Sequence, residues 1–210
     1  DCDWSSDVCS SDLARKNNDQ VLGVCAHVDT LGLMVRSIKS NGYLAITKLG
    51  GPLMPTLDGE YCTIITRDNK RYSGTILSIQ PAAHVYKEAS TLARNDETME
   101  VRLDEIVKSI EDVKALGIQN GDIIAYDSKT LITESGFIKS RFLDDKMSVA
   151  ILFGILEMFK RENILPNYKT YFMFSTYEEV GHGMSSIPED ITELLAVDMG
   201  CIGTDLSCTE

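Results

Sequence analysis

The fold class is decided by residues 145–176, which read DKMSVAILFGILEMFKRENILPNYKTYFMFST. Residues 145–163 predict a helix that is apolar around most of its circumference until its polar end. Such a helix is typically packed between two layers rather than lying on a surface. Pro166 follows the helix, and the apolar run at residues 169–176 predicts a strand. Helix and strand alternating in this way indicate an α/β fold with a mainly parallel sheet.

Strands are also predicted on both sides of this stretch. Residues 21–28 (VLGVCAHV) are a short apolar run suited to a strand buried on both faces, and residues 194–199 (LLAVDM) predict another strand. Residues 33–38 and 43–49 flank the turn signal Ser-Asn-Gly, so they predict a β-meander that continues the first strand.

The middle of the chain differs from both ends in its residue composition and predicted secondary structure. Short segments rich in β-branched residues, YCTIITR, YSGTILSI, MEVRLDEI and DIIAYD, predict a small β module. We therefore expect residues 14–50 and 132–210 to form part of an α/β domain, a mixed sheet flanked by helices. Residues 51–131 are expected to form an inserted, β-barrel-like domain.

Both ends of the sequence are unusual. Residues 1–13 (DCDWSSDVCSSDL) show no helical or strand period and resemble the translation of a sequencing adapter. A natural disordered tail is the alternative. Residues 197–210 follow an apolar strand and stop without a closing helix. We therefore interpret residues 1–13 as a non-native, adapter-derived segment, leave them out of the fold prediction, and expect the chain to be a fragment.

The amino-acid composition argues against several classes of function. The 210 residues hold 20 Lys and Arg against 32 Asp and Glu, a net charge of −12. So acidic a chain is a poor candidate for binding nucleic acid or an anionic membrane, and a reasonable one for holding cations. No apolar run approaches the ~20 residues of a membrane helix. Six cysteines without CxxC spacing, and no signal peptide, favour a reduced, cytoplasmic protein.

Candidate reactive groups follow the predicted strands. His27 and Asp29 end the first strand and point the same way, as a ligand and its orienting carboxylate would. An aspartate that caps a turn beside an ordinary histidine is the alternative. Asp144 and Asp145 open the helix, where aspartate is also a common N-cap.

Two more acidic positions end the later strands. Glu178 and Glu179 come directly after residues 169–176, and adjacent carboxylates there need a cation or a proton to relieve their repulsion. A solvated loop is the alternative. Asp198 lies in an apolar strand, where a carboxylate is costly to bury unless it is paired or bound to a metal.

Together the four clusters indicate a metal centre. Reactive groups of α/β sheets gather at the carboxyl ends of the strands. Carboxylates with one or two imidazoles suit a pair of divalent first-row cations such as Zn, Co or Mn, which a shared carboxylate can bridge.

The chain resembles the glutamyl/tetrahedral (TET) aminopeptidase family, metallopeptidases with two catalytic metal ions and an inserted β domain. The segments AHVDTLGLMV, ITKLGG, SGFIKSRFLDDKMSVA, STYEEVGHG and LLAVDM stand in the family's order. The resemblance implies hydrolysis of N-terminal residues from short peptides. It also implies homo-oligomers, from dimers to dodecamers, assembled through the inserted domain.

The resemblance also implies a role for each site residue. His27, Asp144 and Asp198 would hold the first metal ion, with Asp29 orienting His27. Asp144 would bridge to the second ion, which Glu179 would also bind. Glu178 would be the general base.

One family feature is missing. Family members carry a further metal-binding histidine near the C-terminus, whereas the other histidines here, His84 and His182, match no such motif. We therefore expect this chain to bind the second ion weakly and to hydrolyse peptides poorly. The alternatives are a non-catalytic remnant or assembly module of the same fold, and another metal-dependent hydrolase, such as a deacylase or a relative labelled endoglucanase.

Overall fold

The chain folds into two units. The computed structural model of the protein describes residues 2–3, 8–11 and 19–203. One unit comprises Asp1–Thr30 and Phe142–Glu210, and the other comprises Leu31–Arg141. Among the described residues, no helix combines the length and the apolar character needed to cross a bilayer.

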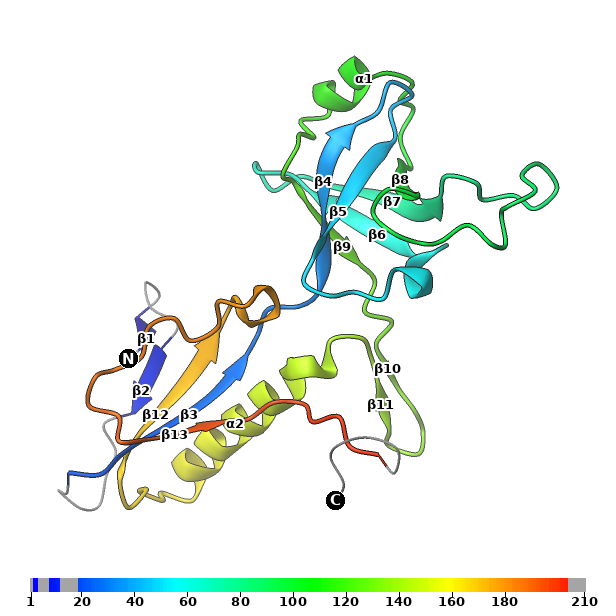
Figure 1. Cartoon of the computed structure of the whole chain (residues 1–210). Helices are drawn as coiled ribbons and strands as arrows, with labels where there is room; N and C mark the ends of the chain where they lie inside the picture. Colours follow the sequence, from blue (N-terminus) through cyan, green and yellow to red (C-terminus); the bar gives the residue numbers. More distant parts are fainter. Residues whose placement is uncertain (1, 4–7, 12–18, 204–210) are drawn as a thin grey trace. The chain divides into compact units, whose positions relative to one another are not determined.

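The first unit is built on a mixed sheet in the order β1-β2-β12-β3-β13 (Figure 1). Its strands are β1 (Cys2–Asp3), β2 (Val8–Ser11), β3 (Val21–His27), β12 (Lys169–Ser175) and β13 (Glu193–Ala196). β3 pairs in parallel with β12 on one side and with β13 on the other, which confirms the predicted α/β class. Parallel pairing brings the carboxyl ends of these three strands to one edge of the sheet.

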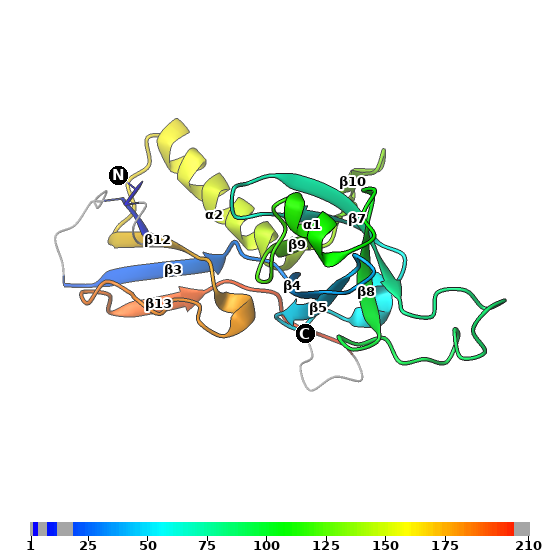
Figure 2. The same ribbon diagram turned by 90° about the horizontal axis from the view of Figure 1, so that it is seen from above.

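Helix α2 (Leu143–Arg161) lies along one face of this sheet (Figures 1 and 2). Leu152 packs there against Ala26 of β3 and Phe172 of β12. On the helix's other side Ile151 is 51% exposed, and Met158 is 39% exposed. The prediction of a helix buried between two layers is therefore wrong for the described residues, because only the sheet side of α2 is covered by them.

The segment at residues 1–13 is only partly described. Residues 1, 4–7 and 12–13, on which the prediction of a foreign segment also falls, lie outside the described ranges. Val8–Ser11, however, pairs antiparallel with β12, with Val8 opposite Met173. The fold prediction, which left residues 1–13 out, therefore missed this strand, whose backbone groups extend the sheet.

The second unit is a closed antiparallel barrel in the order β4-β5-β8-β7-β6-β9. Its strands are β4 (Gly32–Ile38), β5 (Leu44–Leu49), β6 (Tyr61–Ile65), β7 (Arg71–Ser78), β8 (Met99–Leu103) and β9 (Ile123–Tyr126). The unit also contains the 3₁₀ helix η1 (Met54–Leu57), helix α1 (Ile110–Ala115) and a hairpin of β10 (Leu131–Ile132) and β11 (Ile138–Lys139). Inward side chains such as Ile64, Ile76 and Ile124 are fully buried and form the barrel core.

The boundaries between the units differ from those predicted. The predicted inserted domain began at residue 51 and ended at residue 131, whereas the barrel unit spans Leu31–Arg141. β4 and β5 pair with each other and with β9 and β8, and β3 pairs with other strands. The predicted meander through β3 is therefore wrong, because the strand pattern does not tell to which sheet a strand belongs.

Glu60 links two basic side chains within the barrel unit. Its carboxylate lies 2.5 Å from Lys129 Nζ and 3.2 Å from Arg141 Nη1. The hydrogen bond from Lys129, aided by the one from Arg141, lowers the pKa of Glu60 against the opposing effect of burial. A lowered pKa in the folded state contributes stability above the unfolded value of ~4.3, and this is lost as pH falls through the folded value.

We expect Glu60→Gln to reduce the free energy of unfolding by about 1 kcal/mol at pH 7. The difference from the unaltered protein should shrink as the pH falls from 7 to a value below the lowered pKa of folded Glu60, because its carboxyl group is then protonated and as neutral as glutamine. Urea unfolding at the two pH values measures it, and Glu105→Gln, at an exposed position of the same unit, is the control. An equal difference at both pH values would show that charge is not the cause.

Candidate metal centre

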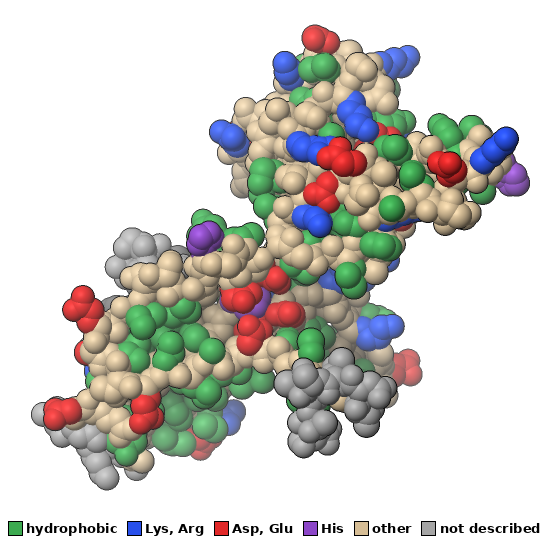
Figure 3. Space-filling model, in the orientation of Figure 1, with side chains coloured by type: hydrophobic (Ala, Val, Ile, Leu, Met, Phe, Trp, Pro, Cys, Tyr) green, Lys and Arg blue, Asp and Glu red, His purple; other side chains and the backbone are tan. Residues whose placement is uncertain are grey.

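The carboxyl edge of the sheet gathers the predicted site residues. His27 is the last residue of β3, and Asp198 follows β13 by two positions. Glu178 and Glu179 open the 3₁₀ turn η2 (Glu178–Val180), which follows β12. In the space-filling view, acidic side chains cluster around a histidine on the α/β unit (Figure 3).

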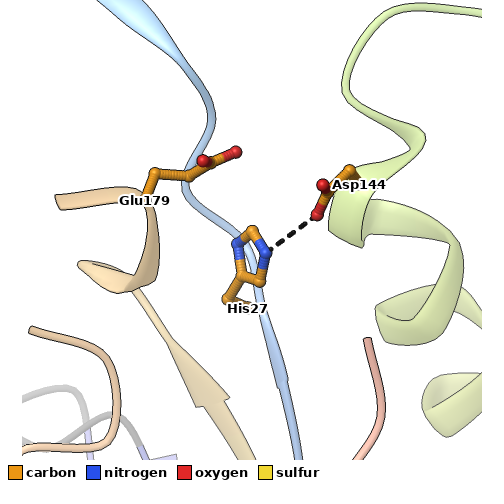
Figure 4. A group of neighbouring side chains, drawn as sticks. All are labelled: His27, Asp144 and Glu179. Carbon is orange, nitrogen blue, oxygen red and sulfur yellow. Dashed lines mark hydrogen bonds and ion pairs between the residues drawn. The ribbon is translucent and has the colours of Figure 1, made fainter. Parts of the chain in front are cut away.

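The imidazole of His27 is the centre of this group. It is 3% exposed, and its Nε2 lies 3.1 Å from Asp144 Oδ1, 3.5 Å from Glu178 Oε2 and 3.8 Å from Asp198 Oδ1. Figure 4 shows the ring between Asp144 of α2 and Glu179 of η2, with the Asp144 contact dashed. Side chains that follow β12 and β13, and one from the start of α2, therefore surround Nε2 of the histidine that ends β3.

Two overlapping groups could hold a metal ion. The ligand atoms of His27, Asp144 and Glu179 lie within 4.8 Å of one another, and so do those of His27, Asp145 and Asp198. Imidazole and carboxylate ligands suit divalent first-row metals. The structure thus brings all the predicted ligands together and places the carboxylate of Asp145 beside them.

The pKa values in the group reflect the concentration of negative charge. Burial lowers the pKa of His27, but the hydrogen bond to Asp144 and the charges of Asp198, Asp29 and Glu178 outweigh it, so the net shift is upward. Burial raises the pKa of Glu179, and the neighbouring charge of Asp144 raises it further. A bound cation would relieve this repulsion among the carboxylates.

Asp29 lies on the other side of the imidazole. Its Oδ1 is 3.3 Å from His27 Nδ1, a contact without hydrogen-bond alignment. The same carboxylate accepts the main-chain N–H groups of Glu178 at 3.2 Å and of Glu179 at 3.0 Å. The negative charge of Asp29 close to Nδ1 favours a proton on that nitrogen, which would leave Nε2 free as a ligand. The two main-chain hydrogen bonds to Asp29 hold the turn that carries both glutamates.

The sequence placed Asp145 in a candidate cluster with Asp144, but only Asp144 was assigned a role in the site. The side chain of Asp145 is fully buried, and its Oδ2 accepts the main-chain N–H of His27 at 3.1 Å. The pair of adjacent aspartates is the feature of the sequence that pointed to this position. Which of them would face inward depends on the backbone there, where both residues have non-helical dihedral angles.

The donor set fits a bound cation. Three buried side-chain atoms of the described residues have no hydrogen-bond partner: His27 Nδ1 and Asp145 Oδ1 in this group, and Asp122 Oδ1 in the barrel unit. Buried polar atoms normally have partners, so those without one mark a site of special function or an unfilled ligand position. A cation bound among these carboxylates could contact Asp145 Oδ1, whereas Nδ1 of His27 faces the carboxylate of Asp29 and not the other carboxylates.

The remaining histidines lie apart from the group. His182 is exposed in the loop after η2, where its main-chain N–H donates to Tyr177 at 2.8 Å. His84 is exposed in the barrel unit. Neither is among the residues that the structure groups as possible ligands.

A pocket of about 330 Å³ adjoins the group. Glu178 and Asp198 line it together with the apolar side chains of Ala26, Met184 and Val197. This volume lies at the lower end of the range for pockets that bind small molecules. An apolar wall beside acidic groups can hold a side chain while polar atoms face the carboxylates.

The fold and site define a class, an α/β protein with an inserted barrel and a carboxylate-rich group of side chains that could hold a metal ion. The model of the M42 glutamyl aminopeptidase family matches residues 11–210. The chain therefore belongs to this family.

Individual relatives agree with this assignment. "Putative aminopeptidase YhfE" of Bacillus subtilis is 50% identical over 179 residues, 85% of this chain and 52% of that protein. Glutamyl aminopeptidase of Lactococcus lactis is 26% identical over 145 residues, 69% of this chain and 40% of that protein. The solved structure of a TET aminopeptidase from a Thaumarchaeota archaeon has a TM-score of 0.79 at 22% identity, covering 93% of this chain and 55% of that one, and so supports the fold. The chain spans about half the length of these relatives.

Proposed function

We propose that the protein is a cytoplasmic, metal-dependent aminopeptidase that removes N-terminal residues from short peptides. The observation that carries the proposal is the convergence of Asp144, Glu178 and Asp198 on Nε2 of His27 at the carboxyl edge of the sheet. Membership of the family and the names of the relatives support it. The unpaired thiols of Cys25 and Cys62 are consistent with a reducing compartment.

We assign two divalent ions, Zn, Co or Mn, to the site. His27, Asp144 and Asp198 would hold the first, and Asp144 would be shared with the second, which Glu179 would also bind. When bound, such ions lower the pKa of water and polarise a carbonyl group. Both groups of possible ligands contain His27, in line with its central place in the assignment.

The remaining groups would handle protons and orientation. Glu178, which is half-exposed and lines the pocket, would accept a proton from the attacking water and later donate it to the leaving amine. Asp29 would orient His27 and keep the Glu178–Glu179 turn in place through its two main-chain hydrogen bonds. The acidic surroundings would attract the protonated amine of the substrate.

The second ion should bind less tightly than the first in this chain. Its proposed ligands here are Asp144 and Glu179 alone, one fewer than the three of the first ion. Removing a ligand lowers metal affinity, so we expect one tight and one weak site for Co²⁺, and slow hydrolysis. We propose that the chain is a fragment of a longer enzyme, which would supply the remaining ligand.

The barrel unit is our candidate for assembly. Solved relatives include a dodecamer, PhTET1-12s, at 22% identity. Exposed apolar side chains of the barrel unit, such as Tyr61 at 69% and Phe137 at 71%, offer contact area. We propose a homo-oligomer formed through this unit, and light scattering of the purified chain measures its mass.

Chelation and reconstitution test the proposed activity. Protein stripped with a chelator should hydrolyse no aminoacyl-coumarin substrate, and added Co²⁺ should restore a slow rate. The matched N-acetylated substrate, which lacks the free amine, should remain intact. Hydrolysis of the acetylated substrate would favour a deacylase or endopeptidase, and metal binding without hydrolysis would favour a non-catalytic module.

A further inference from the structure

The main-chain N–H of His27 lies where the sheet ladder between β3 and β13 ends. The last residue pair of this ladder is Cys25 with Ala196, and Val197 donates to the carbonyl of Cys25 at 2.8 Å. On the other side of β3, Val28 donates to Ser175 of β12 at 2.8 Å. Because successive residues of a strand face opposite neighbours, the N–H of His27 faces the β13 side, beyond the last residue pair.

A side chain from α2 takes the place of the strand at this point. Oδ2 of Asp145 accepts the His27 N–H at 3.1 Å, and both residues are buried, at 0% and 3% exposure. The next residue of the helix, Lys146, donates from Nζ to the carbonyl of Val28 at 2.7 Å. Two successive residues of α2 therefore hold His27, the last residue of β3, and Val28, which follows it.

The neighbouring aspartates act on different parts of His27. Asp144 meets Nε2 of the imidazole, whereas Asp145 binds the main chain of the same residue. The main-chain position of His27 fixes where its ring can lie, since the ring is joined to it by only two rotatable bonds. A displaced N–H would therefore move the proposed ligand atom relative to Asp144 and Asp198.

We propose that Asp145 is a positioning residue of the metal centre, acting through the main chain of His27 and not as a ligand. This inference rests on the proposed function, since it presumes that His27 binds a metal ion. Direct ligation is the competing interpretation, because Asp145 also lies within 4.8 Å of His27 and Asp198 ligand atoms and its Oδ1 has no hydrogen-bond partner. The two roles require different chemistry of the side chain. A hydrogen-bond acceptor suffices for positioning, whereas a carboxylate is needed for ligation.

Two variants of the full chain separate the roles. Asp145→Asn keeps an oxygen that can accept the His27 N–H, and Asp145→Leu fills a similar volume without an acceptor. Calorimetric titration of the metal-free protein with Co²⁺ gives the affinity of the tight site, and visible absorption of bound Co²⁺ reports its coordination. We expect D145N to stay within about 3-fold of the unaltered protein with the same absorption bands. D145L should bind about 10–100-fold more weakly, the usual effect of losing a partner of a metal ligand.

Control variants distinguish a positioning role of Asp145 from ligation and from a general loss of folding. Glu157→Gln, at an exposed position of the same helix, should leave the affinity unchanged. If D145L does not fold by circular dichroism, D145A makes the same test. Affinity lost equally in D145N and D145L would assign Asp145 as a ligand and overturn the proposal. Affinity kept in D145L or D145A would overturn it as well, while the metal site itself would stand. No Co²⁺ binding by the unaltered chain would instead overturn the proposed metal site, and this inference with it.

Discussion

Replacing His27 with alanine is expected to weaken the tight binding of Co²⁺ by about 100-fold or more. Loss of a residue that merely supports a ligand costs about 10–100-fold in affinity, so loss of a ligand itself should cost at least as much. His27 belongs to both groups of possible ligands, so neither is complete without it. Calorimetric titration of the metal-free protein measures the effect.

The matched control is His182→Ala. His182 lies in the same unit but is exposed in the loop after η2, so its removal should leave Co²⁺ affinity unchanged. Circular dichroism of H27A must match that of the unaltered chain for the comparison to hold. Equal affinity in H27A and the unaltered chain would place the metal elsewhere, and loss of affinity in H182A would make that histidine a ligand.

Replacing Glu178 with glutamine is expected to lower kcat by about 10²–10⁴-fold, the usual contribution of a general base. Glutamine keeps the shape of the side chain but cannot accept a proton from water at neutral pH. Since Glu178 is not proposed as a ligand, Co²⁺ affinity should fall much less than in H27A. Hydrolysis of an aminoacyl-coumarin substrate at saturating Co²⁺ and high protein concentration gives the rate.

Glu179→Gln provides the contrast, because the adjacent glutamate has a different proposed role. Loss of a ligand of the weak site should reduce hydrolysis at low Co²⁺, and excess Co²⁺ should restore part of it. The rate of E178Q should not recover at any Co²⁺ concentration. If excess Co²⁺ rescues E178Q and leaves E179Q inactive, the two roles are exchanged.

Much of the α/β unit could be predicted from the sequence. The apolar runs at residues 21–28 and 169–176 correspond to β3 and β12, and parallel pairing follows from the helix between them. Once these strands are parallel, residues just after their carboxyl ends must lie at one edge. This is why His27, Glu178 and Asp198 could be brought together from sequence alone.

The rest depends on contacts between distant residues. β4 and β5 have the same alternating pattern in either sheet, so only their pairing with β9 and β8 assigns them to the barrel. Helix α1 was not predicted, although Ser109 accepts from Asp112 N–H as an N-cap does. The inward turn of Asp145 is set by the local backbone where α2 meets β3, and spacing along the chain does not report it.

The central claim is that the carboxyl edge of the sheet binds a metal ion through His27, Asp144 and Asp198. A crystal structure of the Co²⁺-loaded protein, with anomalous scattering recorded at the cobalt edge, tests it most directly. We expect an anomalous peak about 2.0–2.2 Å from His27 Nε2 and from a carboxylate oxygen of each aspartate, distances typical of first-row ions. A Co²⁺-loaded crystal whose anomalous peaks all lie away from His27 would contradict the assignment of this site.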